Sequence, residues 1–466
     1  MPLARILPVI LFVSLLFLLS ACSKPSSNPP SIGPQACRDL ERMPQDLMPF
    51  ARQAVENRPL ISSGEQSFQA KRTVRLFYAP WSASNPEKGL DKLLKANFGL
   101  QPKKGFSADL RPFSPGEWRR LEENANAKAF PSRSQYAIAV RDTSLRAMPS
   151  NKPYFLNPSK PNEGYPFDYF QQSALHIGSP LYICHISRDN RWVFAQSNLA
   201  SGWLPLEDTA LVDQAFMNDW MACPLAAIVR DKILLKGEGR EARRITGKPS
   251  GLTANIGALL PIGTLYHDGG MQALIPKRSS YGRAEIARIH LMPYQARPLP
   301  VPATPGAVAR IGNEMMAQPY GWGGLDGNRD CSAMMHDLFV PFGIWLPRHS
   351  TAQAASGNQI TLAGLEAADK QAVIMDNGIP FLSLIWLPGH IGLYIGLFEN
   401  KPAIFHNLWG LRINLPGQTK PGNGRAVIGR AAITTLHPGI ERPDLSSPNG
   451  ILDRIEKLVN LPGAHP

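Results

Sequence analysis

Three residues in the C-terminal half of the chain have the types that thiol-dependent hydrolysis requires. Cys331 follows a Gly-rich stretch and Asp330, and the apolar residues after it recur at helical spacing, so we expect it to begin a helix. Free backbone N–H groups and the helix dipole at that position stabilise a thiolate, lower the pKa of the thiol and offer an oxyanion hole. His390 begins a predicted strand, and His406 ends the next predicted strand.

These side chains can serve as a nucleophile, a base and an orienting group. On neighbouring antiparallel strands the two imidazoles can point to one face, where His406 would bond the far nitrogen of His390 and set its tautomer. Spacing alone is weak support, because a buried Cys such as Cys331 is usually an inert apolar residue. The hypothesis therefore needs a more specific pattern.

Four short motifs supply that pattern. In chain order they are Pro319-Tyr320-Gly321-Trp322-Gly323-Gly324, Asp330-Cys331-Ser332, Leu346-Pro347-Arg348 and Gly389-His390-Ile391-Gly392-Leu393-Tyr394-Ile395-Gly396. The segment 303–437 resembles the NlpC family of papain-like bacterial cell-wall cysteine peptidases. The preceding segments are similar to accessory domains of the subgroup that releases γ-D-glutamyl-diamino acid peptides. The resemblance implies hydrolysis of an amide bond in a peptidoglycan stem peptide, with no metal and no other cofactor.

The resemblance also implies roles for individual residues. Cys331 corresponds to the nucleophile, His390 to the base and His406 to the third polar residue. Tyr320 corresponds to a tyrosine whose hydroxyl lies beside the nucleophile and can assist the oxyanion. Positions that line the substrate site in the family correspond to Asp330 and Ser332.

Other positions in the motifs are expected to be structural or to depart from the family. Trp322 is expected to pack, and Gly323 and Gly324 to permit a tight turn. Ala333 replaces the usual Gly after Asp-Cys-Ser, a small change. His349 follows Leu-Pro-Arg, where relatives that demand a free N-terminal L-Ala often carry an Asp that holds the substrate ammonium.

A His cannot supply a fixed negative charge, so recognition of a free L-Ala end is open unless an acid of the first β-unit takes the role. The candidate acids are Glu163, Asp168 and Asp189. In the subgroup this unit forms one wall of the cleft. Four residues therefore either shape the site or are ordinary surface and core: Tyr165, Phe167, Asp168 and Tyr169.

The start of the chain has the pattern of an export signal. Arg5 is followed by an apolar run over residues 6–19, which is short for a membrane span. The run ends in Leu19-Ser20-Ala21-Cys22, which resembles the lipobox of bacterial lipoproteins. We expect residues 1–21 to be removed and Cys22 to carry a lipid that anchors the protein to a membrane. An ordinary signal peptide with a Cys near its cleavage site is the alternative.

The residues after Cys22 are rich in Ser, Asn and Pro, and so predict a tether over 22–37. Ser23, not Asp, follows the expected lipidated residue, which favours the outer membrane in a cell that has one. The formal net charge is +13 and the pI is about 9.6. Since an exported protein rarely meets nucleic acid, anionic envelope polymers are the expected partners, with a generic basic surface as the alternative.

The chain has five cysteines, none in Cys-x-x-Cys spacing, so we expect no zinc site. If Cys22 is lipidated and Cys331 is catalytic, at most one disulfide can form among Cys37, Cys184 and Cys223, and its pairing is open. The sequence does not indicate an oligomeric state.

Along the chain, segments with helical spacing of apolar residues give way to strand-like segments, and this order predicts an α+β protein. A helical domain over 38–130 precedes two SH3-like barrels over 131–215 and 216–297, the second less distinct than the first. Helices are expected over 44–55 and, with a capped start, over 85–95. Asp189-Asn190 marks a hairpin in the first barrel. A generic β-sandwich is the alternative for both barrels. The catalytic domain is expected over 298–440 and a C-terminal tail over 441–466.

Two other functions fit the same residues. Papain-like relatives include amidases and acyl- or peptidyl-transferases with the same Cys-His pair. A non-catalytic wall-binding lipoprotein would use the barrels alone, but it would have no need for Cys331, His390 and His406 together.

Overall fold

The structure is a computed structural model that describes residues 36–97, 105–158, 160–236, 252–417 and 422–463. The predicted signal peptide, Cys22 and most of the tether therefore lie outside the described residues. Within the described ranges, no helix is both long and apolar enough to cross a membrane. No two of the cysteines in these ranges are joined by a disulfide.

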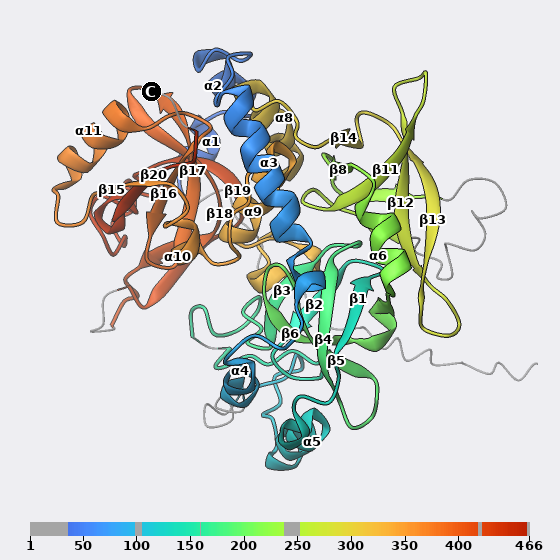
Figure 1. The fold of residues 1–466 in the computed structure, drawn as a ribbon. Helices are drawn as coiled ribbons and strands as arrows, with labels where there is room; N and C mark the ends of the chain where they lie inside the picture. Colours follow the sequence, from blue (N-terminus) through green and yellow to red (C-terminus); the bar gives the residue numbers. More distant parts are fainter. Residues whose placement is uncertain (1–35, 98–104, 159, 237–251, 418–421, 464–466) are drawn as a thin grey trace, which may run out of the picture.

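The C-terminal part is built on a six-stranded antiparallel sheet with the order β15-β20-β16-β17-β18-β19. Helix α9 packs on the sheet and helix α8 lies beside it (Figure 1). The strands are β15 (Asn358–Thr361), β16 (Ser383–Leu387), β17 (His390–Phe398), β18 (Lys401–Ile413), β19 (Gly424–Thr435) and β20 (Lys457–Asn460). The helices are α8 (Pro305–Met315), α9 (Cys331–Phe339), α10 (Ser350–Gln353) and α11 (Ala367–Asn377).

The expectation of a C-terminal tail over 441–466 is wrong. Strand β20 lies between β15 and β16, and its Leu458 and Val459 are fully buried. Its two apolar residues are adjacent and do not alternate with polar ones, so the segment gives only a weak strand signal. Its antiparallel hydrogen bonds to both β15 and β16 satisfy its backbone groups in the sheet. The catalytic unit therefore extends to the end of the described residues.

The N-terminal segment is helical, as predicted, but it does not form a separate core. Its helices are α1 (Asp39–Arg42), α2 (Met48–Gln53), α3 (Ser63–Phe77), α4 (Leu90–Ala96) and α5 (Pro115–Ala125). Leu47 and Phe50 belong to the same apolar core as Leu338 and Phe405 of the catalytic unit. Burial of such side chains stabilises the catalytic unit by about 1.5–3 kcal/mol each.

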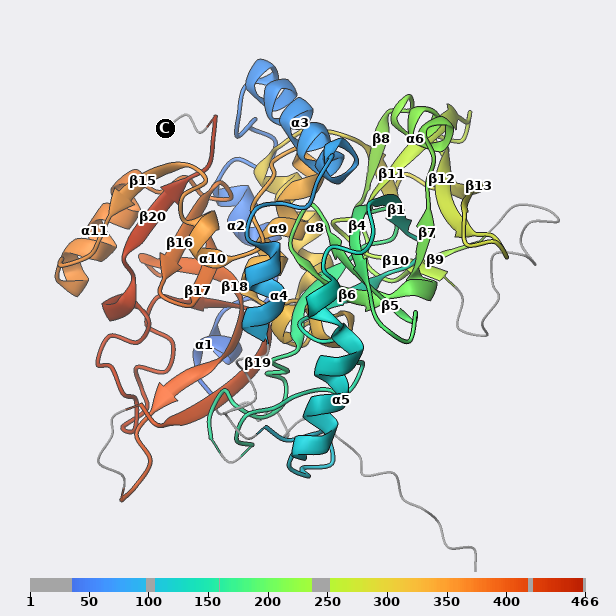
Figure 2. The ribbon, with the colours of Figure 1, turned by 60° about the horizontal axis from the view of Figure 1, so that its bottom comes forward.

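Helix α3 crosses the molecule between the catalytic sheet and the β-units (Figures 1 and 2). Ser62 caps its start by accepting a hydrogen bond from the Glu65 N–H. The Thr73 hydroxyl donates to the carbonyl of Gly343 over 2.7 Å. The expected capped helix over 85–95 begins only at Leu90, because Gly89 precedes it with a left-handed φ of 92° and no side chain caps it.

The first β-unit is a seven-stranded antiparallel sheet with the order β3-β2-β6-β5-β4-β1-β7. Its strands are β1 (Gln135–Ala139), β2 (Thr143–Arg146), β3 (Gln171–Leu175), β4 (Pro180–Ile186), β5 (Trp192–Gln196), β6 (Ser201–Pro205) and β7 (Thr209–Leu211). The predicted hairpin at Asp189-Asn190 joins β4 to β5, and Asn190 has the positive φ of 56° that such a turn needs.

Helix α6 (Gln214–Met221) leads into the second β-unit, a five-stranded sheet with the order β13-β12-β11-β8-β14. Its strands are β8 (Leu225–Ile228), β11 (Leu259–Leu265), β12 (Met271–Arg278), β13 (Ala284–Leu291) and β14 (Ala296–Pro298). A two-stranded sheet of β9 (Ile233–Leu235) and β10 (Leu252–Ala254) accompanies it. Among the described strands, β13 and β14 do not pair with each other, so the sheet is open in its hydrogen bonding. A second SH3-like barrel stays a prediction.

Candidate active site

Cys331 is the first residue of α9, where the sequence places it. Asp330 is the N-cap residue, with an extended backbone and a carboxylate that accepts a hydrogen bond of 2.8 Å from the Ala333 N–H. This cap explains why the helix begins at Cys331. Cys331 as a whole is only 6% exposed.

The two histidines meet as predicted. His390 begins β17, and its Nε2 lies 2.9 Å from Nδ1 of His406 on β18. His406 stands in the middle of β18 and not at its end, because this strand runs on to Ile413. Gly392 permits the contact, since a Cβ at this position would lie 2.8 Å from Cβ of His406. On the other side, Nε2 of His406 lies 3.2 Å from the hydroxyl of Thr434 on β19.

A cleft of about 530 Å³ opens beside Cys331. Of the predicted site residues, Tyr320, Asp330, Cys331, Ser332 and Tyr169 line it, and His349 does so too. The sequence analysis missed further lining residues, which come from α4 and its end, from β3 and from α10: Ala96, Asn97, Gln171, Gln172, Ser350 and Thr351. Ser350 and Thr351 follow the Leu-Pro-Arg motif closely, whereas the other four residues lie far from the motifs in sequence, and no local pattern marks them.

Asp330 and Ser332 border the cleft, but their polar groups are used within the protein. The Arg348 guanidinium pairs with Asp330 over 2.6 Å and also donates to the Ser332 hydroxyl and to Ser173 of β3, each over 3.0 Å. The side chains of Arg348 and Asp330 are only 4% and 11% exposed. Their main role in this structure is to join the Leu-Pro-Arg loop, the start of α9 and the first β-unit.

The structure does not place Asp168 at the substrate. Asp168 is fully buried, pairs with Arg146 over 2.6 Å and accepts hydrogen bonds from the N–H groups of Tyr154 and Phe170. A carboxylate that is already satisfied inside the β-unit is not available to a substrate ammonium. Tyr169, the next residue, is half-buried and does line the cleft.

The Gly-rich loop docks on the first β-unit. Gly323 and Gly324 have φ values of 62° and 89°, and a Cβ on either would lie within 3 Å of Gln171 or Ala174 of β3. The predicted tight turn is therefore present, and it also allows close approach of the two units. Trp322, which we expected to pack, does contact Phe167, with ring centroids 5.2 Å apart, yet it is 38% exposed and forms part of the cleft wall.

The expected low pKa of the nucleophile is not what the structure shows. Burial of Cys331 and the neighbouring Asp330 carboxylate raise the pKa of its thiol to about 12, although the N–H groups of Ile391 and Ser332 act in the opposite direction. Burial, with Arg454 nearby, lowers the pKa of His390 to about 4. At neutral pH both partners are uncharged, so His390 is suited to take the thiol proton as a general base.

Two other groups near the thiol are also held neutral. Burial and the nearby Cys331 raise the pKa of Tyr320 well above its usual value, so its hydroxyl keeps the proton and remains a donor. Burial and the Arg348 charge lower the pKa of His349, which leaves it uncharged at neutral pH.

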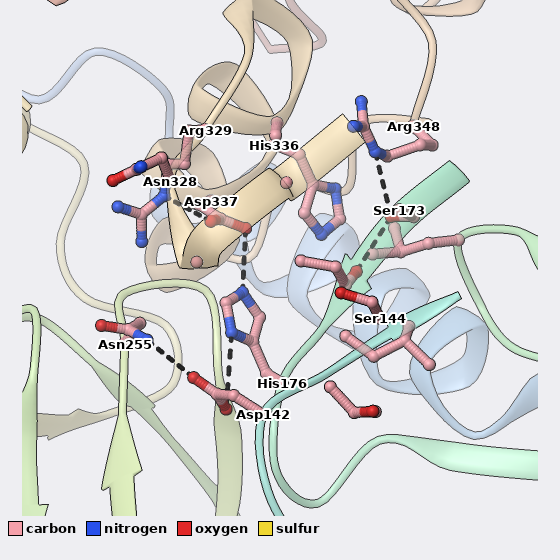
Figure 3. A pocket seen from close by; sticks show the side chains of 17 residues that line it. Asp142, Ser144, Ser173, His176, Asn255, Asn328, Arg329, His336, Asp337 and Arg348 are labelled. Carbon is pink, nitrogen blue, oxygen red and sulfur yellow. Dashed lines mark hydrogen bonds and ion pairs between the residues drawn. The ribbon is translucent and has the colours of Figure 1, made fainter. Parts of the chain in front are cut away.

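A second cavity of about 130 Å³, with several charged side chains in its lining, lies beside α9 (Figure 3). His176 of the first β-unit lies 3.2 Å from the Asp337 carboxylate of α9. Burial alone would lower the pKa of His176, but the carboxylates of Asp337 and Asp142 outweigh it and raise the pKa to about 10. Arg329 also pairs with Asp337, over 2.6 Å. This buried charge network holds α9, which begins with Cys331, against the β-unit.

A cysteine at a helix start, set beside two hydrogen-bonded histidines on an antiparallel sheet, defines the class of papain-like cysteine hydrolases. The comparison with protein families agrees. Residues 317–419 match the NlpC/P60 family, residues 11–130 the N-terminal stabilising domain of these proteins, and residues 153–205 an SH3 domain of the SH3b1 type. The chain thus carries an NlpC/P60 domain together with an N-terminal stabilising domain and an SH3 domain, and it is a hydrolase of the cysteine peptidase type. The SH3 match covers only the first β-unit.

Similar proteins are endopeptidases by name. The chain is 27% identical over 159 residues, 34% of its length, to a probable endopeptidase of Corynebacterium glutamicum strain R, of which the match covers 70%. A probable endopeptidase from another strain of the same species is 26% identical over 157 residues, with the same coverage. An NlpC/P60 endopeptidase structure from Photobacterium damselae subsp. piscicida is 24% identical, with a TM-score of 0.79 over 90% of this chain and 96% of that one, which shows a shared fold.

Proposed function

We propose that this protein is a peptidoglycan endopeptidase that cleaves the amide bond between D-γ-glutamate and the diamino acid of a stem peptide. The observation that carries the proposal is the hydrogen-bonded pair of His390 and His406. The next residue of the same strand, Ile391, bonds through its N–H to Cys331, which lines a cleft that the SH3 domain helps to wall. Membership of the NlpC/P60 family supports the reaction class. The choice of bond rests on the likeness to the subgroup with SH3-like domains.

In the first step, the Cys331 sulfur attacks the scissile carbonyl while its proton passes to His390. Because the thiol and the imidazole are both neutral beforehand, bond formation and proton transfer are coupled. The developing oxyanion lies near the start of α9, where the free N–H of Cys331 and the Tyr320 hydroxyl are the available donors. His406 keeps the ring of His390 in place through the 2.9 Å contact.

The protonated His390 then donates its proton to the departing amine, and the C–N bond breaks to leave a thioester on Cys331. A water molecule that gives up a proton to His390 attacks the thioester. The C–S bond then breaks and His390 returns its proton to the sulfur, so that the products are the glutamyl carboxylic acid and the free thiol. No step needs a group beyond these residues and water.

We also propose that the protein works outside the cytoplasm and is tethered to a membrane by a lipid on Cys22, with the outer membrane favoured where one exists. The family assignment to wall hydrolysis supports an envelope location. The positive net charge of +13 suits an anionic wall polymer. Labelling with a fatty-acid analogue should mark the wild type but not Cys22→Ala; an unlabelled wild type would contradict this part.

The function is tested by digesting purified sacculi and defined muropeptides with wild type and with Cys331→Ala, followed by mass spectrometry. We expect fragments that end in D-glutamate and fragments that begin with the diamino acid, from the wild type only. Circular dichroism of Cys331→Ala should match the wild type, since the change is small. Cleavage at another amide bond would assign another specificity, and equal digestion by both proteins would exclude Cys331 as nucleophile.

A further inference from the structure

The hydrogen-bonded histidines raise a question about protons, because a neutral imidazole has one N–H and one lone pair. His390 and His406 are both buried, and burial lowers the pKa of both, so neither carries a charge at neutral pH. The 2.9 Å contact between His390 Nε2 and His406 Nδ1 can hold its proton on either atom. Only one choice leaves a lone pair on His390 Nδ1, the nitrogen that remains for the thiol.

Thr434 decides between the two choices. Its hydroxyl lies 2.7 Å from the carbonyl oxygen of Thr435 and 3.2 Å from Nε2 of His406. A hydroxyl has one proton, and 2.7 Å is the usual length of an O–H···O bond, so the proton goes to the carbonyl. The hydroxyl oxygen then accepts from His406, which places the proton of His406 on Nε2.

The direction of the remaining hydrogen bonds, from His406 to His390, follows from this. His406 has its lone pair on Nδ1 and accepts from Nε2–H of His390, and His390 therefore has its lone pair on Nδ1. The Cys331 sulfur lies against the backbone N–H of Ile391, the residue that follows His390 on β17. We propose that Thr434 is a positioning residue that sets the tautomers of both histidines and so makes Nδ1 of His390 the base. This inference rests on the mechanism proposed above.

The N-terminal segment holds this part of β19 in place. Asp39 of α1 accepts hydrogen bonds of 2.8 Å from both the N–H and the hydroxyl of Thr435, the residue whose carbonyl receives the Thr434 proton. Gln45 pairs through its side chain with both the N–H and the carbonyl of Ile433, each over 3.0 Å. The segment thus covers the open edge of β19 on both sides of Thr434. It thereby holds in place the carbonyl of Thr435 that accepts the Thr434 proton.

The test replaces the hydroxyl by a methyl group of similar shape. In Thr434→Val, Nε2–H of His406 loses its acceptor at a fully buried position, which favours the opposite tautomer in both rings. We expect kcat to fall about ten-fold with little change in KM, because the productive form becomes a minor fraction. Thr434→Ser keeps the hydroxyl and should restore most of kcat.

A matched control is Thr73→Val. Thr73 is also fully buried and its hydroxyl also donates to a carbonyl over 2.7 Å, but it lies on α3 and the carbonyl is that of Gly343. It should lose a similar amount of thermal stability while kcat stays within about two-fold of wild type. If Thr73→Val lowers kcat as much as Thr434→Val, the effect is one of general stability and the proposal is overturned.

A direct readout is the ¹⁵N spectrum of histidine side chains, with the ten histidines of the chain assigned by single replacements. We expect His390 and His406 of the wild type to be protonated at Nε2, and both to shift toward Nδ1 in Thr434→Val. Protonation of His390 at Nδ1 in the wild type would overturn the proposal even if the enzyme is active. Failure of the proposed function gives a different result. Cys331→Ala would then hydrolyse the substrate as fast as wild type, and the ¹⁵N spectra would still report the two tautomers.

Discussion

The buried ion pair between Arg348 and Asp330 should be one of the most sensitive points of the molecule. Replacing Arg348 by Met keeps most of the side-chain volume but leaves the Asp330 carboxylate with only its hydrogen bonds to N–H and hydroxyl groups. It also removes the 3.0 Å bond to Ser173 that ties the Leu-Pro-Arg loop to the SH3 domain. Stranding a buried charge in this way costs about 3–5 kcal/mol of unfolding free energy.

The exposed fraction of the paired side chains, not the distance between them, decides how much unfolding free energy is lost when the pair is broken. Arg42 and Glu399 lie 2.8 Å apart, nearly as close as the 2.6 Å of Arg348 and Asp330, but their side chains are 62% and 59% exposed against 4% and 11%. Water screens the exposed pair, so Arg42→Met should cost only about 0–1 kcal/mol. It serves as the matched control.

The assay is urea unfolding followed by tryptophan fluorescence, for wild type, each single variant and the double variant Arg348→Met/Asp330→Asn. The double variant should regain part of the loss, because the carboxylate is no longer charged. If Arg348→Met costs no more than Arg42→Met, or if adding Asp330→Asn deepens the loss, the reasoning from the buried charge is refuted.

Three further outcomes are expected. Because the pKa of His390 is lowered to about 4 and that of Cys331 raised to about 12, kcat/KM should be flat from about pH 5 to about pH 9 and fall as His390 gains a proton at lower pH; an acidic limb above pH 6 in the pH–rate profile would contradict this. His390→Ala should lower kcat by about a hundred- to ten-thousand-fold on a stem peptide, more than His406→Asn, which keeps a hydrogen-bonding group; the reverse order would exchange the two roles. His349→Asp adds a negative charge at the cleft. It should raise the ratio of kcat/KM for a peptide with a free L-Ala amine to kcat/KM for its N-acetylated form by about five-fold. An unchanged ratio would show that this position does not face the amine.

Local signals predicted the parts of the site that depend on local geometry. A helix that begins at Cys331 follows from an N-capping Asp and helical spacing of apolar residues, and the facing of His390 and His406 follows from alternation on adjacent strands. These patterns need only neighbours along the chain or across one hairpin. The same kind of local pattern predicts the type of each segment, and so the order of helices, β-units and C-terminal sheet along the chain.

Charge states and partners depended on tertiary structure. Asp168 is a plausible ligand in sequence, yet folding places it beside Arg146 in a dry interior. Cys331 stands at a helix start that should lower its pKa, but burial and the Asp330 carboxylate outweigh the helix end, and neither effect has a local sequence signature.

The longest-range contacts were the least predictable. Asp39 and Thr435 are 396 residues apart in the chain, and Arg348 and Ser173 are 175 apart, yet these contacts hold β19 and α9 in place. Periodicity says which face of an element is apolar, but it does not say which distant segment covers that face. Sequence alone thus predicted the chemistry and three candidate residues for it. Tertiary packing decided the protonation of these residues, the walls of the cleft and the inclusion of both ends of the described chain in the C-terminal unit, because burial and pairing exist only once distant segments meet.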